Sequence, residues 1–141
     1  TAASGFGAAL GVDLAQQSAL YDASSYAGIK FRARLGTTVT TPTVMRVAVP
    51  NVNSDAKGKC CKSNCGDHWG KEFSISSTWT DFTLSFSEMR FTHAGFGDSE
   101  CAANAAFDAS QIYAIVFQFE PLAGVDRPFD VWIDDLSFIA P

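Results

Sequence analysis

Charged, amide and indole side chains recur at alternate positions of segments that have the pattern of β-strands. Arg32 and Arg34 alternate with apolar residues in the segment 29–35, and Arg46 does the same in 44–49. The other members lie near the C-terminus and are Gln118, Glu120, Asp130 and Trp132. Residues two apart on a strand point to the same face of a sheet. We therefore predict that these seven side chains share one exposed face, opposite the apolar residues.

This combination of groups suits a ligand that carries many hydroxyls and apolar C–H faces, such as a sugar chain. Arg, Gln, Glu and Asp side chains form paired hydrogen bonds with hydroxyls. An aromatic ring packs on the C–H face of a sugar with little loss of entropy. A solvated sheet face held by cross-strand ion pairs is the alternative interpretation. Trp132 in the middle of the set makes a glycan groove an equally good explanation, because large exposed aromatics tend to mark binding sites.

Two further tryptophans lie outside these strands. Trp69 follows Gly66, Asp67 and His68 in a polar loop, where it serves either as a ligand platform or as an anchor of the loop. Trp79 directly precedes the apolar alternation of 82–86, and we expect it to cap the edge of the core.

Asp134 and Asp135 are adjacent, so they are expected to point to opposite faces of the last strand. Asp135 would then share the face of Val131 and Ile133 at the rim of the core, where a carboxylate needs a partner. A structural Ca²⁺ and a salt bridge or turn hydrogen bond are equally good partners. The run 51–58 loosely resembles a calcium loop but lacks its final glutamate.

Four cysteines, Cys60, Cys61, Cys65 and Cys101, fall in two polar loops. An even count in a loop-rich chain favours two disulfides and an oxidising, extracellular compartment. Zinc bound by the first three cysteines and His68 is the alternative. The adjacent pair chelates one ion awkwardly and no second CxxC pair is present, so disulfides are favoured.

Catalytic motifs are absent from the sequence. No nucleophile elbow, HExxH helix or phosphate-binding loop occurs, and nothing near His68 or His93 completes a triad. The carboxylates that a glycosidase would pair across a bond cannot be paired from sequence. The net charge of −5 without a basic stripe disfavours nucleic acid and anionic lipid as partners. No apolar run of about 18 residues exists that could span a membrane.

The length of 141 residues fits a single domain, 1–141, with enough apolar residues for a core. Period-2 alternation predicts seven strands, which is typical of an antiparallel two-sheet β-sandwich. The predicted strands are 29–35, 44–49, 82–86, 112–119 and 129–139, with weaker ones at 8–14 and 72–76.

An internal echo supports this architecture. Tyr21-Asp22-Ala23-Ser24 and Phe107-Asp108-Ala109-Ser110 precede two of these strands at the same offset. Because Asp and Ser side chains close local turns onto the following backbone, we interpret both segments as equivalent strand entries.

The order of five segments resembles carbohydrate-binding modules of the β-jelly-roll type, which are attached to bacterial plant-cell-wall-degrading glycoside hydrolases. The segments are 21–31, 44–53, 65–70, 79–84 and 131–138, and they span nearly the whole chain.

The resemblance implies a jelly roll that binds polysaccharide without catalysis, often with a structural Ca²⁺ for which Asp135 is the candidate. It implies a glycan site on the strand face of Arg32, Arg46, Gln118 and Trp132. The expected ligands are β-glucan, cellulose-derived oligosaccharide or xyloglucan, bound by a secreted monomer linked to a catalytic domain. A small jelly-roll polysaccharide lyase or hydrolase, and an adhesive or structural domain without a glycan ligand, are the alternatives.

Overall fold

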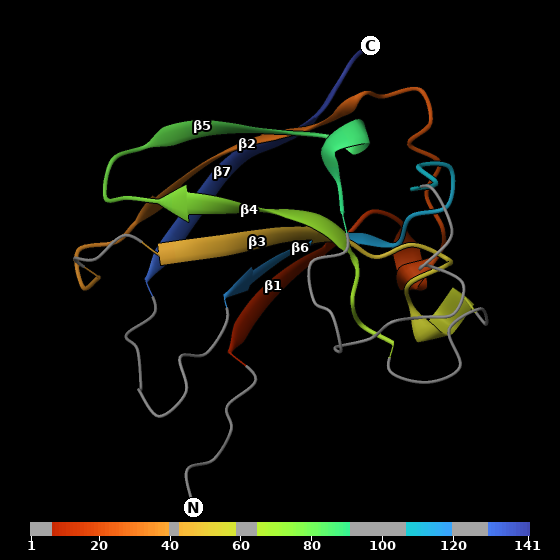
Figure 1. Ribbon diagram of the computed structural model, residues 1–141, viewed down its shortest axis with the longest axis horizontal. Coiled ribbons are helices and arrows are strands. Elements are labelled where there is room, and N and C mark those ends of the chain that lie inside the picture. The colour runs from red at the N-terminus through yellow and green to blue at the C-terminus, as the bar shows by residue number, and fades with distance from the viewer. Residues whose placement is uncertain (1–6, 40–42, 59–64, 91–106, 120–129) are drawn as a thin grey trace, which may run out of the picture.

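The computed structural model is a sandwich of two antiparallel β-sheets (Figure 1). The structure describes residues 7–39, 43–58, 65–90, 107–119 and 130–141. One sheet has the strand order β1-β6-β3-β4 and the other β5-β2-β7. The strands are β1 (Ala8–Asp13), β2 (Gly28–Leu35), β3 (Thr43–Val49), β4 (Trp69–Ile75), β5 (Thr80–Ser85), β6 (Ala114–Phe119) and β7 (Val131–Ile139).

The predicted fold class is confirmed, and each predicted strand overlaps one of these seven. The helical elements among the described residues are 3₁₀ turns: η1 (Gln16–Ser18), η2 (Ala56–Gly58) and η3 (Phe86–Glu88). None of the helices in this part of the chain has the length and hydropathy needed to cross a membrane.

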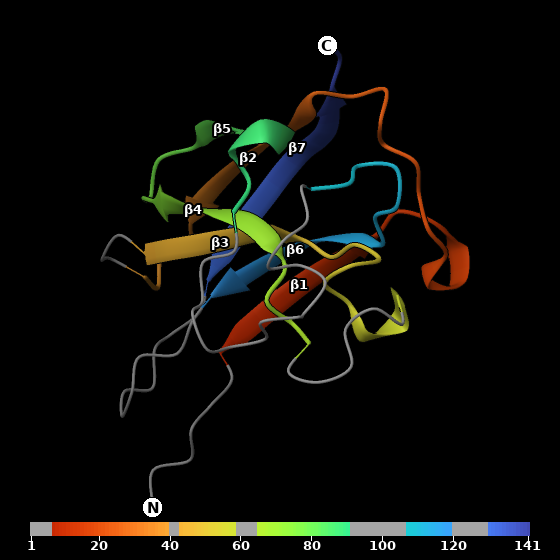
Figure 2. The ribbon, with the colours of Figure 1, turned by 45° about the vertical axis from the view of Figure 1, so that its right-hand side comes forward.

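The core lies between the two sheets, which Figure 2 shows from a second direction. Phe31 of β2 is its centre, because its ring stacks on Phe82 of β5 at 5.3 Å and meets Phe117 and Phe73 of the other sheet edge-on. Alternation puts the polar residues of each strand on the opposite side. The fully or nearly buried apolar side chains include Ile29, Ala33, Leu35, Met45, Val47, Val49 and Ile115.

Strand β7 contains a β-bulge that changes the face of Asp135. Trp132 pairs with Arg34 and Asp134 pairs with Arg32. Between Arg32 and Lys30 of β2 the register shifts, so that Lys30 pairs with Ser137. Asp135 takes up the extra residue with a φ of 52°, and its exposed carboxylate lies 3.8 Å from the Arg32 guanidinium. The prediction that Asp135 shares the core-rim face of Val131 and Ile133 is therefore wrong, because a bulge turns the strand between the two aspartates.

The two echoed segments form equivalent turns, as predicted. The backbone N–H of Ser24 donates to Asp22 Oδ1 at 2.9 Å, and that of Ser110 donates to Asp108 Oδ1 at 2.9 Å. These serine hydrogen bonds lower the pKa of both aspartates. The turns also contact each other, because Ala23 N–H donates to the carbonyl of Ala109 at 2.8 Å.

Candidate functional site

The polar side chains expected on one face are divided between the two sheets. Arg32, Arg34 and Trp132 lie on the outer face of β5-β2-β7, whereas Arg46 and Gln118 belong to the four-stranded sheet. Both sheets bury their inner residues against each other, so the two outer faces are turned away from one another. The prediction of a single surface is wrong, because alternation assigns a face within each strand but not the sheet that the strand joins. Glu120 lies outside the described residues.

The outer face of β5-β2-β7 carries two tryptophans on either side of one arginine. Trp132 is the cross-strand partner of Arg34, and Trp79 directly precedes Thr80, the partner of Ala33. The Arg34 Cζ atom lies 5.2 Å from the ring centre of Trp79 and 5.5 Å from that of Trp132. These are cation–π distances. We call Trp79, Arg34 and Trp132 the tryptophan row.

Exposure differs between the two indoles of the row. Trp132 is 54% exposed, which is unusual for so large an apolar side chain, and Trp79 is partly exposed. The expectation that Trp132 would face solvent is thus confirmed. Trp79 had been expected to cap the core edge, and its place beside Arg34 could have been anticipated only from the β2–β5 register.

The next row along the strands is charged. Asp81 and Asp134 flank Arg32 as cross-strand partners. Arg32 Nε lies 3.0 Å from Asp81 Oδ1, and Asp135 approaches the same guanidinium from the bulge. These groups are well exposed, so their ion pairs contribute little stability. We call Asp81, Arg32 and Asp134 the charged row, in which Arg32 and Asp81 form a cross-strand ion pair of the kind that the alternative interpretation expects.

Asp130 holds the end of the tryptophan row in place. Its Oδ1 accepts a hydrogen bond from the Trp132 indole N–H at 3.2 Å, and its Oδ2 accepts one from the Thr38 hydroxyl at 3.0 Å. Its backbone carbonyl accepts from the Gly36 N–H at 2.7 Å. The carboxylate thus ties the chain after β2 to the indole of β7.

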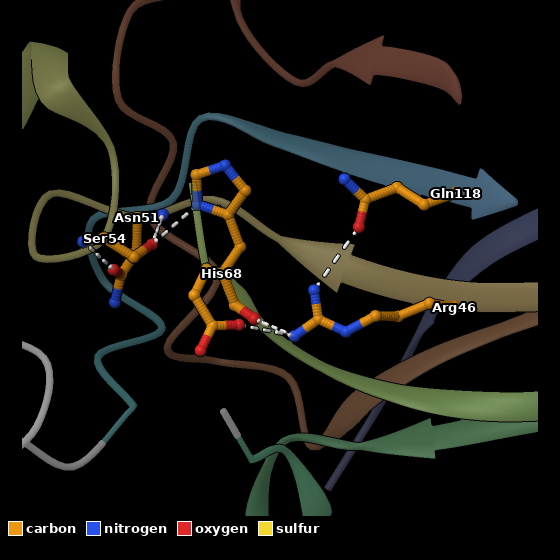
Figure 3. Close-up of polar contacts among 6 residues, drawn as sticks. Arg46, Asn51, Ser54, His68 and Gln118 are labelled. Carbon is orange, nitrogen blue, oxygen red and sulfur yellow. Dashed lines mark hydrogen bonds and ion pairs between the residues drawn. The ribbon is translucent and has the colours of Figure 1, made fainter. Parts of the chain in front are cut away.

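Arg46 is buried in a polar network on the other sheet (Figure 3). Its side chain is 4% exposed, its Nη1 donates to Gln118 Oε1 at 3.3 Å, and its Nη2 lies 3.2 Å from Asp67 Oδ1. Nη2 also donates to the carbonyl of His68. The prediction that Arg46 offers its guanidinium to a ligand is wrong. The guanidinium is buried, and its hydrogen bonds hold Asp67 and His68 against β3.

His68 continues this network to the turn that follows β3. Its Nδ1 lies 3.0 Å from the Ser54 hydroxyl, and Asn51 Oδ1 accepts from the backbone N–H groups of Asn53 and Ser54. The pKa of His68 is lowered to about 4, mainly by burial; the nearby Asp55 carboxylate opposes this shift and the Arg46 charge adds to it. Ser54 is fully buried, so its hydroxyl is not accessible to a substrate in solution. Asn51 therefore closes the turn that follows β3.

Trp69 is an anchor and not an exposed platform. It is 7% exposed, it pairs with Val49 as the first residue of β4, and its ring meets Phe107 edge-on at 6.0 Å. Its edge reaches a hollow of about 500 Å³ that Tyr26 and Phe86 also line. The platform interpretation is wrong because β4 begins three residues before the segment predicted at 72–76. Trp69, Phe73 and Ile75 lie at odd positions of one alternating pattern. The sequence therefore contained a signal that the predicted strand 72–76 begins earlier, at Trp69.

Metal binding finds little support in the described part of the chain. No group there brings together three or more His, Cys, Asp or Glu side chains around a common point. The exposed carboxylate of Asp135 lies 3.8 Å from the Arg32 guanidinium, and a structural Ca²⁺ at this residue stays a prediction. Cys65 is disulfide-bonded, which contradicts its role as a zinc ligand. Cys60, Cys61 and Cys101 lie outside the described residues, so the pairing of the four cysteines stays a prediction.

Comparison with known proteins identifies the fold. No family model matches the chain, and no curated protein matches it. A family 11 carbohydrate-binding module from Clostridium thermocellum, solved with a beta-1,3-1,4-mixed-linked tetrasaccharide, is similar with a TM-score of 0.62 and 16% identity, over 94% of this chain and 67% of that one. The family 11 module of the cellulosomal cellulase Lic26A-Cel5E of the same organism has a TM-score of 0.59 and 17% identity, over 94% and 66%. The solution structure of CtCBM11 has a TM-score of 0.53 and 15% identity, over 99% and 87%. This chain therefore has the jelly-roll fold of these modules, as the resemblance implied.

Proposed function

We propose that this chain is a non-catalytic module that binds β-glucan-type polysaccharide on the outer face of β5-β2-β7. The observation that carries the proposal is the exposed indole of Trp132, held beside the guanidinium of Arg34 and hydrogen-bonded to Asp130. An aromatic face with adjacent charged donors and acceptors suits the C–H faces and hydroxyls of a sugar chain. Two of the predicted ligand residues, Arg34 and Trp132, lie side by side there.

The likeness in fold supports a carbohydrate ligand. One neighbour was solved with a mixed-linked β-glucan tetrasaccharide, and another is a module of a cellulase. We extend the proposal to β-glucan, cello-oligosaccharide or xyloglucan chains, to secretion with two disulfides, and to a linked glycoside hydrolase that the module brings to its substrate.

A structural domain is the second candidate, and a specific observation favours it. Arg32 is paired with Asp81, and Arg34 lies within cation–π distance of two rings, so the outer face has internal partners of its own. In such a domain the tryptophan row would stabilise the sheet, and substitution of Trp132 would lower the unfolding temperature without changing any binding.

The test is affinity electrophoresis of wild type and Trp132→Ala through gels with mixed-linkage β-glucan, xyloglucan, xylan or mannan. We expect the β-glucan gels to retard the wild type, and the variant to lose about fivefold to tenfold in affinity, since a lost aromatic contact is worth about 1 to 1.4 kcal/mol. Val44→Ala is the matched control, because Val44 is equally exposed on the other sheet.

The two candidates give different results in this experiment. Full retardation of Trp132→Ala with a lowered unfolding temperature would favour the structural domain. Unretarded migration of the wild type through every gel would remove the binding proposal altogether.

A further inference from the structure

Strand β1 has apolar side chains on the inner face of its sheet that the core does not cover. Leu10 and Val12 pair with Phe117 and Ile115 of β6, and directly paired residues share a face. Phe117 and Ile115 are buried, whereas Leu10 is 53% exposed and Val12 is 39% exposed. The core therefore ends at β6, and the inner face of β1 is open to solvent.

The different widths of the two sheets explain this exposure. The Phe31 ring of β2 meets Phe73 of β4 and Phe117 of β6, so β2 lies across from β3, the strand between them. Phe82 of β5 meets Phe73, so β5 lies across from β4. By the same order β7 lies across from β6, and none of the described strands lies across from β1 (Figure 1, Figure 2). We call the space across from β1 and beside β7 the strand gap.

Strand β7 borders the strand gap with an edge of its backbone. Within the described part of the chain it pairs with β2 and with no other strand. Every second residue of an edge strand directs its N–H and C=O groups away from the sheet. Val131 and Ile133 pack against the core but are only half-buried. One more strand beside β7 would satisfy the backbone groups of the edge and cover Leu10 and Val12 at the same time.

We propose that the strand gap binds an extended segment of another protein, which adds to β7 as a fourth strand of the smaller sheet. The backbone groups of β7 favour a peptide over a sugar or a lipid, because a peptide strand has N–H and C=O groups at the same spacing. The gap is one strand wide, about 4.8 Å, and a helix with side chains measures about 10 Å. The bulge at Asp135 interrupts the edge, so the segment pairs with residues 131–134.

A second copy of this chain cannot supply the strand through its own β7. If two smaller sheets joined at their β7 edges, β1 of one copy would lie across from β7 of the other copy. The β6 strand of that other copy already occupies this position, because β7 lies across from β6. The protruding strand β1 therefore selects a single narrow segment over a second copy.

Charges along the edge specify the residues of the segment. Asp134 is exposed on the outer face of β7, and Asp135 is exposed in the bulge beside it. Outward residues of an added strand would lie next to Asp134, on the side opposite Arg32, where Lys or Arg forms an ion pair and Asp or Glu is repelled. Inward residues would lie over Leu10 and Val12, which branched apolar side chains can cover. The segment therefore alternates apolar and basic residues.

A peptide with blocked ends that alternates valine and lysine, and matches the six residues of β1 in length, tests the proposal. Titrated into ¹⁵N-labelled wild type, it should shift the amide signals of residues 131–134, Leu10 and Val12. Hydrogen exchange of the outward-directed amides of β7 should slow in the complex. A peptide with glutamate in place of lysine should bind about tenfold more weakly, because its carboxylates would lie beside Asp134.

Leu10→Ser should weaken binding of the valine–lysine peptide about tenfold, because the apolar contact is lost. Val44→Ser is the matched control, since Val44 is equally exposed on the outer face of the same sheet, and it should bind the peptide like the wild type. Neither residue lies on β5-β2-β7, so both variants should bind β-glucan as the wild type does, and the result is independent of the proposed function.

The titration of the wild type keeps the test valid if Leu10→Ser does not fold. Unchanged signals of residues 131–134, or shifts confined to β4 and β5, would overturn the proposal. Equal binding of a peptide with the same composition but its valines and lysines in two blocks would also overturn it. A dimer in light scattering that Leu10→Ser dissociates would replace it with self-association.

Discussion

The indole N–H of Trp132 donates a hydrogen bond to Asp130 Oδ1 across 3.2 Å, within the same short stretch of chain. The second oxygen of that carboxylate holds Thr38, which follows β2. A freely rotating exposed indole would lose side-chain entropy on binding a sugar. Because Asp130 fixes one edge of the ring and Arg34 lies against it, much of that entropy is already lost in the free protein, and binding costs less.

Asp130→Ala should weaken binding without unfolding the protein. The variant removes the acceptors of Trp132 and Thr38, so we expect a severalfold loss in affinity for β-glucan and a loss of about 1 kcal/mol in unfolding free energy. Asp130→Asn retains a carbonyl acceptor for the indole and should recover most of the affinity. Calorimetry and urea unfolding measure the two effects. Unchanged affinity of Asp130→Ala would show that the ring needs no such positioning.

Gly36→Ala should disturb the same site from the opposite side. A Cβ atom on Gly36 would lie 1.9 Å from Asp130 Oδ2, so the carboxylate must move away and release Trp132. We expect weaker β-glucan binding and greater quenching of tryptophan fluorescence by acrylamide. Gly11→Ala is the control, because its Cβ would meet only Val116 at an ordinary 3.9 Å. Equal binding by both variants would contradict this account of the clash.

Strand positions and outward faces were predictable because one face of each strand is buried. Lys30, Arg32 and Arg34 alternate with core residues in β2, and Trp132 does the same in β7. The sheet that each strand joins depends on contacts between residues far apart in the sequence, which alternation does not encode. Arg46 has the same local pattern as Arg34 and is nevertheless buried on the other sheet.

Two other errors each concern a single residue. The bulge at Asp135 requires a positive φ, which Asp tolerates better than most residues, but the alternation around it gives no sign of an extra residue. The burial of Trp69 follows from its pairing in β4 and its contact with Phe107, whereas the glycines and charges around it are typical of a loop. In both cases the contact that decided the outcome comes from a distant segment.

Arg46→Met should destabilise the fold far more than Arg32→Met. Arg46 and Asp67 are both buried, so Arg46→Met removes the cation that lies beside the buried Asp67 carboxylate. Breaking a buried ion pair in this way costs about 3–5 kcal/mol in unfolding free energy. Arg32 and Asp81 are exposed, and the same substitution there should cost at most about 1 kcal/mol. Urea unfolding at neutral pH gives both values.

The double variant Arg46→Met/Asp67→Leu isolates the charge effect of the buried pair. It removes both charges and should recover part of the loss, because no uncompensated carboxylate then remains in the interior. Equal costs for Arg46→Met and Arg32→Met would mean that the buried network contributes no more than a surface pair.

His68 should make the fold sensitive to pH between about 6.5 and 4. Burial lowers the pKa of His68 to about 4 from its ordinary 6.5. Above pH 6.5 the ring is neutral in both states and contributes no pH dependence. As the pH falls below 6.5, the unfolded chain binds a proton that the folded chain does not, so stability decreases until the folded ring also titrates near pH 4. The total loss is at most about 3.5 kcal/mol, since a shift from 6.5 to about 4 corresponds to about 1.4 kcal/mol per pH unit.

His68→Asn isolates this contribution, because its carboxamide can replace Nδ1 as the partner of the Ser54 hydroxyl and does not titrate. The carboxylates and the second histidine are the same in both proteins, so their effects cancel in the difference between the two stability curves. The free energy of unfolding, measured by urea at half-unit steps from pH 7 to 4, should fall more steeply in the wild type than in the variant. A difference between the curves that stays constant over this range would mean that the imidazole titrates equally in both states, so burial beside Arg46 would not disfavour its proton.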